Sequence, residues 1–186
     1  MRYLPFLLTT LRLLLGPMAL LLAFIGGQRW IYFPILLIAT LSDIYDGVIA
    51  RRLGIATPAL RRYDSITDLI FYLFILGTAW KLEPTLISQN RLWIAAILIS
   101  EFMIIFLCAA KFGKFPATHS YLAKSYGLYL LAMLTAVLVF GAGNGAVISL
   151  AIVALVTNLE ILGIHLIMAT PPVDVKSIFR LPNRKK

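Results

Sequence analysis

The sequence has few charged residues and little polar sequence outside short segments. Of its 186 residues, 13% are charged and 61% are hydrophobic, and the mean hydropathy is +0.92. A soluble domain is about half apolar and about a quarter charged. This composition excludes an ordinary soluble domain. Because no long polar segment remains for a second domain, we expect a single one.

Cysteine and acidic residues are also scarce. The single cysteine, Cys108, excludes an internal disulfide and lies in an apolar run, where a packing role is expected. Eight acidic residues stand against 17 lysines and arginines. The basic residues do not form a soluble basic surface, so no nucleic-acid partner is expected. Membrane lipids are the expected surroundings.

Apolar stretches long enough to cross a bilayer fill most of the chain. A transmembrane helix needs about 20 mostly apolar residues. Six such stretches are predicted, at residues 6–26, 31–50, 65–82, 92–110, 122–141 and 145–168. The first resembles a signal peptide, but Arg12 interrupts it and no small-residue cleavage site follows, so we expect it to be retained. The predicted fold is an all-α integral membrane protein with six transmembrane helices.

The basic residues predict the orientation of these spans. With the N-terminus in the cytoplasm, the outer loops carry three basic residues, Arg29, Lys81 and Arg91, and most of the others lie inside. This asymmetry predicts that both termini are cytoplasmic. We divide the chain into a six-span domain, residues 1–170, and a basic cytoplasmic tail, residues 171–186, attracted to anionic lipid head groups.

Four of the eight acidic residues fall close together in the sequence. Asp43 and Asp46 are three residues apart, and Asp64 and Asp68 are four apart. At helical spacing each pair shares one face. An arginine-rich loop, residues 51–63, joins the two helices, so we expect them to be antiparallel neighbours. Acids inside apolar spans are costly and usually mark a functional site.

Four carboxylates in one small volume repel each other unless cations are present. Oxygen-only ligands suit Mg²⁺ or Mn²⁺ rather than zinc. Two such ions are therefore predicted, an arrangement that can stabilise both the attacking and the leaving oxygen in phosphoryl transfer. Gly47 leaves room for a ligand near the backbone, and Arg51, one turn further, is placed to pair with a phosphate.

Residues 43–51 read D-I-Y-D-G-V-I-A-R, and Asp64 and Asp68 follow. This stretch resembles the signature of the CDP-alcohol phosphotransferases, D-x-x-D-G-x-x-A-R, eight residues, then G-x-x-x-D-x-x-x-D. The similarity extends to the six-span layout and to Thr9, Thr10 and Arg12 in the first span.

The resemblance implies roles for individual residues. Asp43, Asp46, Asp64 and Asp68 would be metal ligands, and Asp68 would also be the catalytic base on the acceptor hydroxyl. The CDP moiety would be bound by Gly47, Ala50 and Arg51. The implied reaction joins an alcohol to the phosphatidyl-type group of a CDP-alcohol, CDP-diacylglycerol in our expectation, and releases CMP in phospholipid biosynthesis. A homodimer with its active site facing the cytoplasm is also implied.

Two positions bear on the substrates. Leu60 stands where the signature has glycine. The larger side chain of leucine would narrow the space for the nucleotide, so the identity of the donor remains open. Leu69 follows the fourth aspartate, where members that use glycerol phosphate often carry lysine. The leucine weakens the assignment of glycerol phosphate as the acceptor. The acceptor alcohol itself remains open: serine, inositol, inositol phosphate, glycerol phosphate or a second lipid.

Two other functions remain as alternatives. Leu60 is the main support for an inactive member that binds nucleotide or lipid, although all four aspartates are retained. A cation transporter would explain the buried acids, but not the fixed spacing of Gly47, Ala50 and Arg51. Glu101 and Glu160, within the fourth and sixth spans, are predicted to make packing contacts between helices.

Overall fold

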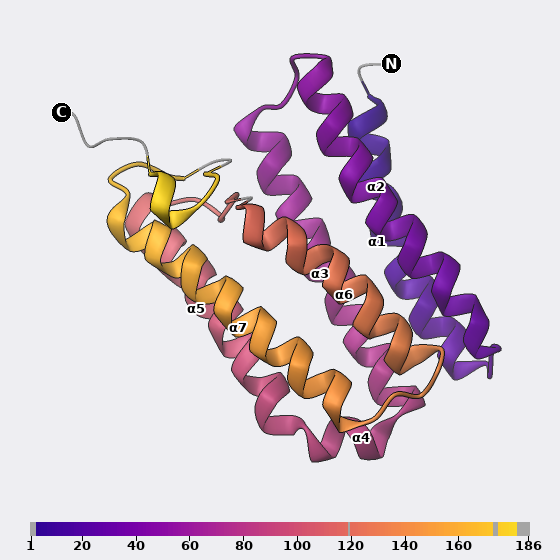
Figure 1. Cartoon of the computed structure of the whole chain (residues 1–186). Helices are drawn as coiled ribbons and strands as arrows, with labels where there is room; N and C mark the ends of the chain where they lie inside the picture. Colours follow the sequence, from indigo (N-terminus) through magenta and orange to yellow (C-terminus); the bar gives the residue numbers. More distant parts are fainter. Residues whose placement is uncertain (1–2, 119, 173–174, 182–186) are drawn as a thin grey trace.

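The computed structural model describes residues 3–118, 120–172 and 175–181. Over these residues the chain forms seven α-helices, two 3-10 helices and no strand, so the predicted all-α fold is confirmed (Figure 1). The elements are α1 (Leu4–Phe24), η1 (Arg29–Ile31), α2 (Tyr32–Arg52), α3 (Pro58–Leu82), α4 (Pro84–Gln89), α5 (Arg91–Phe112), α6 (Tyr121–Leu138), α7 (Asn144–Ile167) and η2 (Ile178–Arg180).

Six of the helices are long and apolar enough to cross a membrane. They are α1, α2 with η1, α3, α5, α6 and α7, with 18 to 25 residues each. At a rise of about 1.5 Å per residue, the longer ones match the hydrocarbon core of a bilayer, which is about 30 Å thick. The six predicted spans therefore correspond to six observed helices.

The third helix begins earlier than the hydropathy pattern predicts. The expected span started at residue 65, whereas α3 begins at Pro58. Thr57 accepts a hydrogen bond from the backbone N–H of Leu60, and proline at the first helical position has a suitable fixed φ. Most of the predicted arginine-rich loop is therefore helical. Arg61 lies on α3, about one turn before Asp64.

The first helix lies against both aspartate-bearing helices. Contacts of α1 with α2 and with α3 are far more extensive than any between α2 and α3. The predicted neighbours α2 and α3 therefore make little backbone contact with each other, although Arg61 of α3 lies beside Gly47 of α2. Gly16 allows the close approach of α1 to α3, because a Cβ at this position would lie 3.2 Å from side-chain atoms of Phe74 and 3.4 Å from the Cα of Phe71.

The remaining helices form a second group. Helix α7 packs between α5 and α6, and α6 also contacts α2, so it joins the two groups (Figure 1). The apolar core is centred on the first group, where Leu15, Ala19, Ile35, Ile75 and Leu138 from α1, α2, α3 and α6 are buried. Helices α3 and α5, by contrast, make little direct backbone contact with each other.

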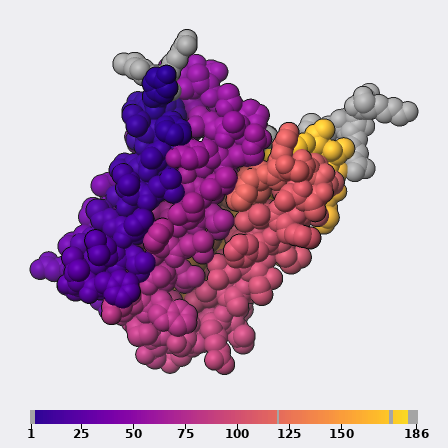
Figure 2. Space-filling view, turned by 180° about the vertical axis from the view of Figure 1, so that it is seen from behind, coloured from indigo at the N-terminus to yellow at the C-terminus, as the bar shows by residue number. Residues whose placement is uncertain are grey.

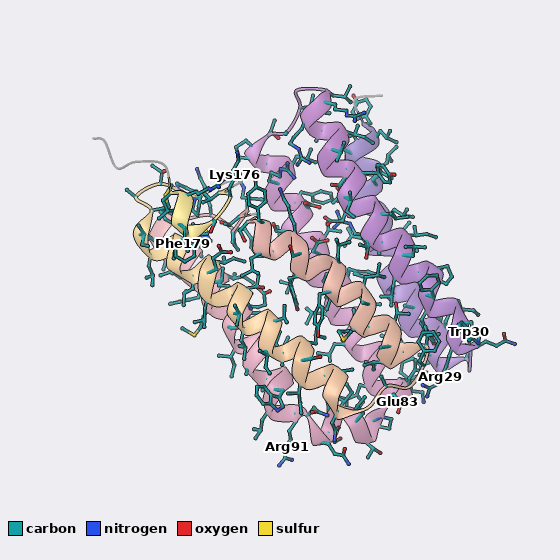
Figure 3. The ribbon with its side chains drawn as sticks, in the orientation of Figure 1. Arg29, Trp30, Glu83, Arg91, Lys176 and Phe179 are labelled. Atoms are coloured by element: carbon teal, nitrogen blue, oxygen red, sulfur yellow. The ribbon has the colours of Figure 1, made fainter. Side chains whose placement is uncertain are left out.

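Two groups of residues mark the two ends of the bundle. Arg29, Glu83 and Arg91 lie at one end, and Lys176 and Phe179 lie at the other (Figure 3). The start of α1 and the loop between α2 and α3 lie at the same end as Lys176 (Figure 1). This is the arrangement expected of an even number of spans.

The described part of the C-terminal segment folds back onto the helices. The carbonyl of Lys176 accepts a hydrogen bond from the N–H of Tyr121 at the start of α6. Glu160 of α7 accepts hydrogen bonds from Ser177 and Ser120, at 2.9 and 2.7 Å. Glu160 therefore ties the segment to α7 and to the start of α6.

Candidate active site

Four aspartates from two helices converge around one arginine of a third. Asp43 and Asp46 project from α2, Asp64 and Asp68 project from α3, and all four contact Arg12 of α1. Nη1 of Arg12 lies 3.0 Å from Oδ1 of Asp43 and also contacts Asp68. Nη2 lies 2.6 Å from Oδ2 of Asp46 and contacts Asp64. The predicted convergence of the carboxylates is thus observed.

The burial of this cluster is uneven. Arg12 is only 1% exposed, and the side chains of Asp46 and Asp64 are each 5% exposed. The side chains of Asp43 and Asp68 are 43% and 29% exposed. Two carboxylates therefore form the closed floor of the site, and the other two are accessible to a ligand.

Helix α1 is fixed against the site by further contacts. The hydroxyl of Thr9, one turn before Arg12, lies 2.8 Å from Oδ2 of Asp46. The hydroxyls of Thr10 and Tyr63 lie 2.9 Å apart, and the ring of Phe6 stacks on that of Tyr63 at 5.0 Å. These contacts hold Arg12 at the depth of the four carboxylates.

The oxygen atoms of the cluster suit a divalent cation. One carboxylate oxygen from each of Asp43, Asp64 and Asp68 lies within 4.8 Å of the others. Asp46 lies against Arg12 and Thr9, on the buried side of the same cluster. The donors are all hard oxygens, which matches Mg²⁺ or Mn²⁺. Since one guanidinium balances only one of four negative charges, the site also has the charge to attract cations.

Two more arginines lie beside the cluster at Gly47. A Cβ at Gly47 would lie 3.3 Å from Nη1 of Arg61 and 3.4 Å from Nη1 of Arg51. Arg51 is exposed, whereas Arg61 and Ala50 are buried. The glycine thus lets two guanidinium groups come close to the backbone of α2. Guanidinium groups so placed are typical of a phosphate site.

A sequence model of the CDP-alcohol phosphatidyltransferase family matches residues 2–170. The chain belongs to this family. Searches of curated proteins and of solved structures gave no match. CDP-alcohol phosphatidyltransferases are transferases that move a phosphatidyl group from a CDP-alcohol to an alcohol acceptor in membranes, and the family uses divalent metals.

The sequence predicts no role for Arg12 in this member of the family. In the sequence, Arg12 interrupts the first apolar span and belongs to the family resemblance. A charged residue within an apolar span indicates function by default, and this signal was available. What the sequence could not show is that α1, rather than α2 or α3, supplies the cation at the centre of the cluster.

Proposed function

We propose that this CDP-alcohol phosphatidyltransferase transfers a phosphatidyl-type group from CDP-diacylglycerol to the hydroxyl of an acceptor alcohol and releases CMP. The observation that carries the proposal is the convergence of Asp43, Asp46, Asp64 and Asp68 on one position at one end of the bundle. Family membership supports the reaction type.

In this proposal the four aspartates hold two Mg²⁺ or Mn²⁺ ions. The accessible carboxylates of Asp43 and Asp68 and the buried ones of Asp46 and Asp64 supply the oxygen ligands. When bound, the ions neutralise charge on the pyrophosphate and on the oxygens that enter and leave. Arg12 then shares the carboxylates with the ions and orients them, since it contacts every one.

In the proposed chemical step, Asp68 accepts the proton of the acceptor hydroxyl. Its carboxylate, partly exposed, takes the proton from the acceptor hydroxyl as the hydroxyl oxygen attacks the phosphorus that carries the donor's alcohol. A new oxygen–phosphorus bond forms, and the bond from that phosphorus to the bridging oxygen of the pyrophosphate breaks. CMP leaves with that oxygen, and the phosphatidyl group stays on the acceptor.

Binding of the CDP moiety is assigned to the α2 side of the site. Arg51 pairs with a phosphate of the donor, and Gly47 and Ala50, both buried, keep this part of α2 free of bulky side chains. We add Arg61 to this set, because its guanidinium lies beside Gly47 together with that of Arg51.

The proposed site faces the cytoplasm, and both termini lie on that side. Most lysines and arginines lie at the aspartate end of the bundle, whereas Arg29 and Arg91 lie at the other (Figure 3). A cysteine-free protein with Cys108→Ala allows a test. We expect Ala56→Cys to react with a membrane-impermeant maleimide in inside-out vesicles, and Ser88→Cys in right-side-out vesicles. The reverse pattern contradicts the orientation.

The assay that tests the function is CMP release by the purified protein in lipid nanodiscs. CDP-diacylglycerol is supplied with Mg²⁺ or Mn²⁺ and a panel of acceptor alcohols, and parallel samples contain EDTA. We expect CMP release that requires both an acceptor and a divalent ion. Nucleotide binding without CMP release, over the whole panel, contradicts the enzyme and favours an inactive binding protein. The same preparation reports the oligomeric state by light scattering, where a homodimer is expected.

A further inference from the structure

The chain turns back along the side of α7 after that helix ends. Ile178 packs on Gly163, where an added Cβ would lie 2.6 Å from the Cδ1 of Ile178. Gly163 comes four residues before the end of α7 at Ile167. At about 1.5 Å per residue, Ile178 therefore lies roughly 6 Å back along the axis from that end. Elements that lie on a bilayer reach about 5–10 Å into the boundary between head groups and acyl chains, so the segment returns to that depth.

The face of α7 that Ile178 covers is an outward one. Leu159 and Leu166 are about one turn before and one turn after Gly163, and both are exposed. Residues at this spacing share one face of a helix. On a membrane-spanning helix, exposed leucines face lipid tails, which are equally apolar. The turn η2 therefore lies on the lipid-facing side of the bundle, where it extends the apolar surface of α7.

Phe179 projects from this turn and is almost uncovered by the protein. It is 94% exposed, more than any other large apolar side chain in the described part of the chain. It lies with Lys176 at the aspartate end of the bundle (Figure 3). Lys176 and Arg180 are exposed on either side of it, and residues 175–186 contain five basic and no acidic residues. An aromatic ring between two cations matches the surface of a membrane with anionic lipids.

Hydrogen bonds fix the segment to the bundle. The hydroxyl of Ser177 and the N–H of Ile178 both donate to Oε1 of Glu160, at 2.9 and 3.3 Å. Oε2 of Glu160 accepts from Ser120, whose hydroxyl oxygen also accepts from the N–H of Ala123 and so caps α6. In the space-filling view the yellow surface of the segment lies beside the surface at the start of α6 (Figure 2). Phe179 is therefore held in one place rather than carried on a loose tail.

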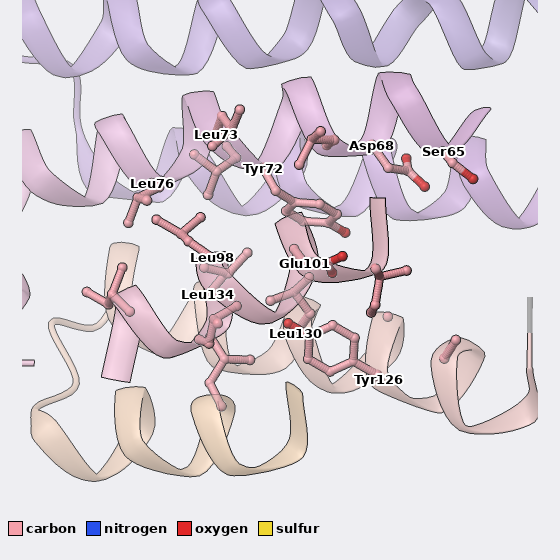
Figure 4. A pocket seen from close by; sticks show the side chains of 18 of the residues that line it. Ser65, Asp68, Tyr72, Leu73, Leu76, Leu98, Glu101, Tyr126, Leu130 and Leu134 are labelled. Atoms are coloured by element: carbon pink, nitrogen blue, oxygen red, sulfur yellow. The ribbon is translucent and has the colours of Figure 1, made fainter. Parts of the chain in front are cut away.

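The same contacts reach the helix that faces the proposed active site. Helix α6 begins at Tyr121, and the N–H of Tyr121 donates to the carbonyl of Lys176. Tyr126, further along α6, lines one cavity together with Asp68 of α3 (Figure 4). Attachment of the segment to the bilayer would therefore fix the start of α6 relative to the membrane surface.

We infer that residues 175–180 form a membrane-surface anchor that binds the head-group region of a bilayer containing anionic lipids. Phe179 enters the boundary between head groups and acyl chains, and Lys176 and Arg180 bind lipid phosphates. The partner of this surface is the bilayer itself and not a substrate lipid. The inference therefore stands or falls independently of the proposed reaction.

The test measures the depth of position 179 by electron paramagnetic resonance of a spin label. The label is attached through Phe179→Cys in the Cys108→Ala protein, in nanodiscs of phosphatidylcholine with phosphatidylglycerol. The control label is at Ala56→Cys, in the exposed loop between α2 and α3. We expect collisions with a water-soluble nickel complex to be at least about fivefold rarer at position 179 than at position 56, and collisions with oxygen to be more frequent.

Equal nickel collision rates at the two positions place the segment in water and overturn the inference. Protection of position 179 from both the nickel complex and oxygen identifies a protein surface, such as a second copy of the chain, as its cover and also overturns it.

The recognition of anionic lipid is tested in the same samples. We expect nanodiscs without phosphatidylglycerol to raise the nickel collision rate at position 179 about twofold. Lys176→Gln combined with Arg180→Gln should raise it similarly while phosphatidylglycerol is present. Lys114→Gln, which removes an exposed charge outside the segment, is the control and should leave the rate unchanged. A rate that responds to neither the lipid nor the double substitution overturns the binding of anionic lipid by these two residues.

Discussion

The two ends of the bundle each contain an arginine paired with acids from other helices, but in different proportions. At one end Arg29, before α2, pairs with Glu83, after α3, one to one. At the other end Arg12 contacts four carboxylates. The first pair is partly exposed, with side chains 40% and 26% accessible, whereas Arg12 is buried.

The difference separates a structural contact from a functional one. A one-to-one pair near the surface neutralises itself and contributes about 0–1 kcal/mol to stability. Four carboxylates outnumber the guanidinium of Arg12 and those of Arg51 and Arg61 beside it, and such a partly buried excess of negative charge is costly unless further cations bind. The excess of carboxylates at the aspartate end is therefore the feature on which the proposed metal dependence rests.

The largest expected effect distinguishes the two ends by activity. Asp68→Asn keeps the size of the side chain but removes the proposed base, and we expect CMP release to fall by about 100-fold or more. Glu83→Gln is the matched control at the other end and should keep activity within about twofold. Initial rates with saturating donor and Mg²⁺ measure both. Equal losses in the two variants contradict the assignment of Asp68.

A second comparison concerns stability without metal. Arg12→Gln leaves the four carboxylates without their common partner, and we expect the free energy of unfolding in EDTA to fall by about 3 kcal/mol. Arg29→Gln should lower it by about 1 kcal/mol or less. Mg²⁺ should restore part of the loss in Arg12→Gln and have no such effect in Arg29→Gln.

Denaturant unfolding in detergent micelles, with EDTA or with Mg²⁺, measures these four values. A loss in Arg12→Gln that Mg²⁺ does not reduce contradicts the view that the guanidinium and the ions share the same carboxylates.

A smaller effect is expected at the nucleotide side of the site. Gly47→Ala places a methyl group 3.3 Å from the guanidinium of Arg61 and 3.4 Å from that of Arg51, so the Arg61 guanidinium must move by a few tenths of an ångström. We expect KM for CDP-diacylglycerol to rise roughly five- to tenfold with little change in kcat. Gly145→Ala, in α7 with open space around its Cβ position, is the control. A change in kcat alone contradicts a donor-binding role for this position.

Hydropathy predicted the number of spans, because each observed long helix carries an apolar run. It misplaced the start of α3 because Arg61, Arg62 and Asp64 mask the first turns, although Thr57 and Pro58 are a readable helix start. A hydropathy average over a polar helix end has the low value that is typical of a loop, so the helix start is missed. Capping residues are the better guide there.

The site was predicted in part. Fixed spacing within two helices was enough to predict that Asp43, Asp46, Asp64 and Asp68 face a common position. The position of Arg12 could not be predicted, because it depends on α1 packing against both α2 and α3, a long-range contact. The small direct contact between α3 and α5 over the described residues is likewise a long-range property that leaves no signal in local sequence.

The most direct test of the account is Mn²⁺ binding, measured by electron paramagnetic resonance with the purified protein and no substrate. The account predicts two ions per chain for the wild type, a loss of binding in Asp64→Asn, and unchanged binding in Glu83→Gln. Binding that Asp64→Asn leaves unchanged, or an absence of bound Mn²⁺ in the wild type, would contradict the claim that the aspartate end is a metal-dependent site.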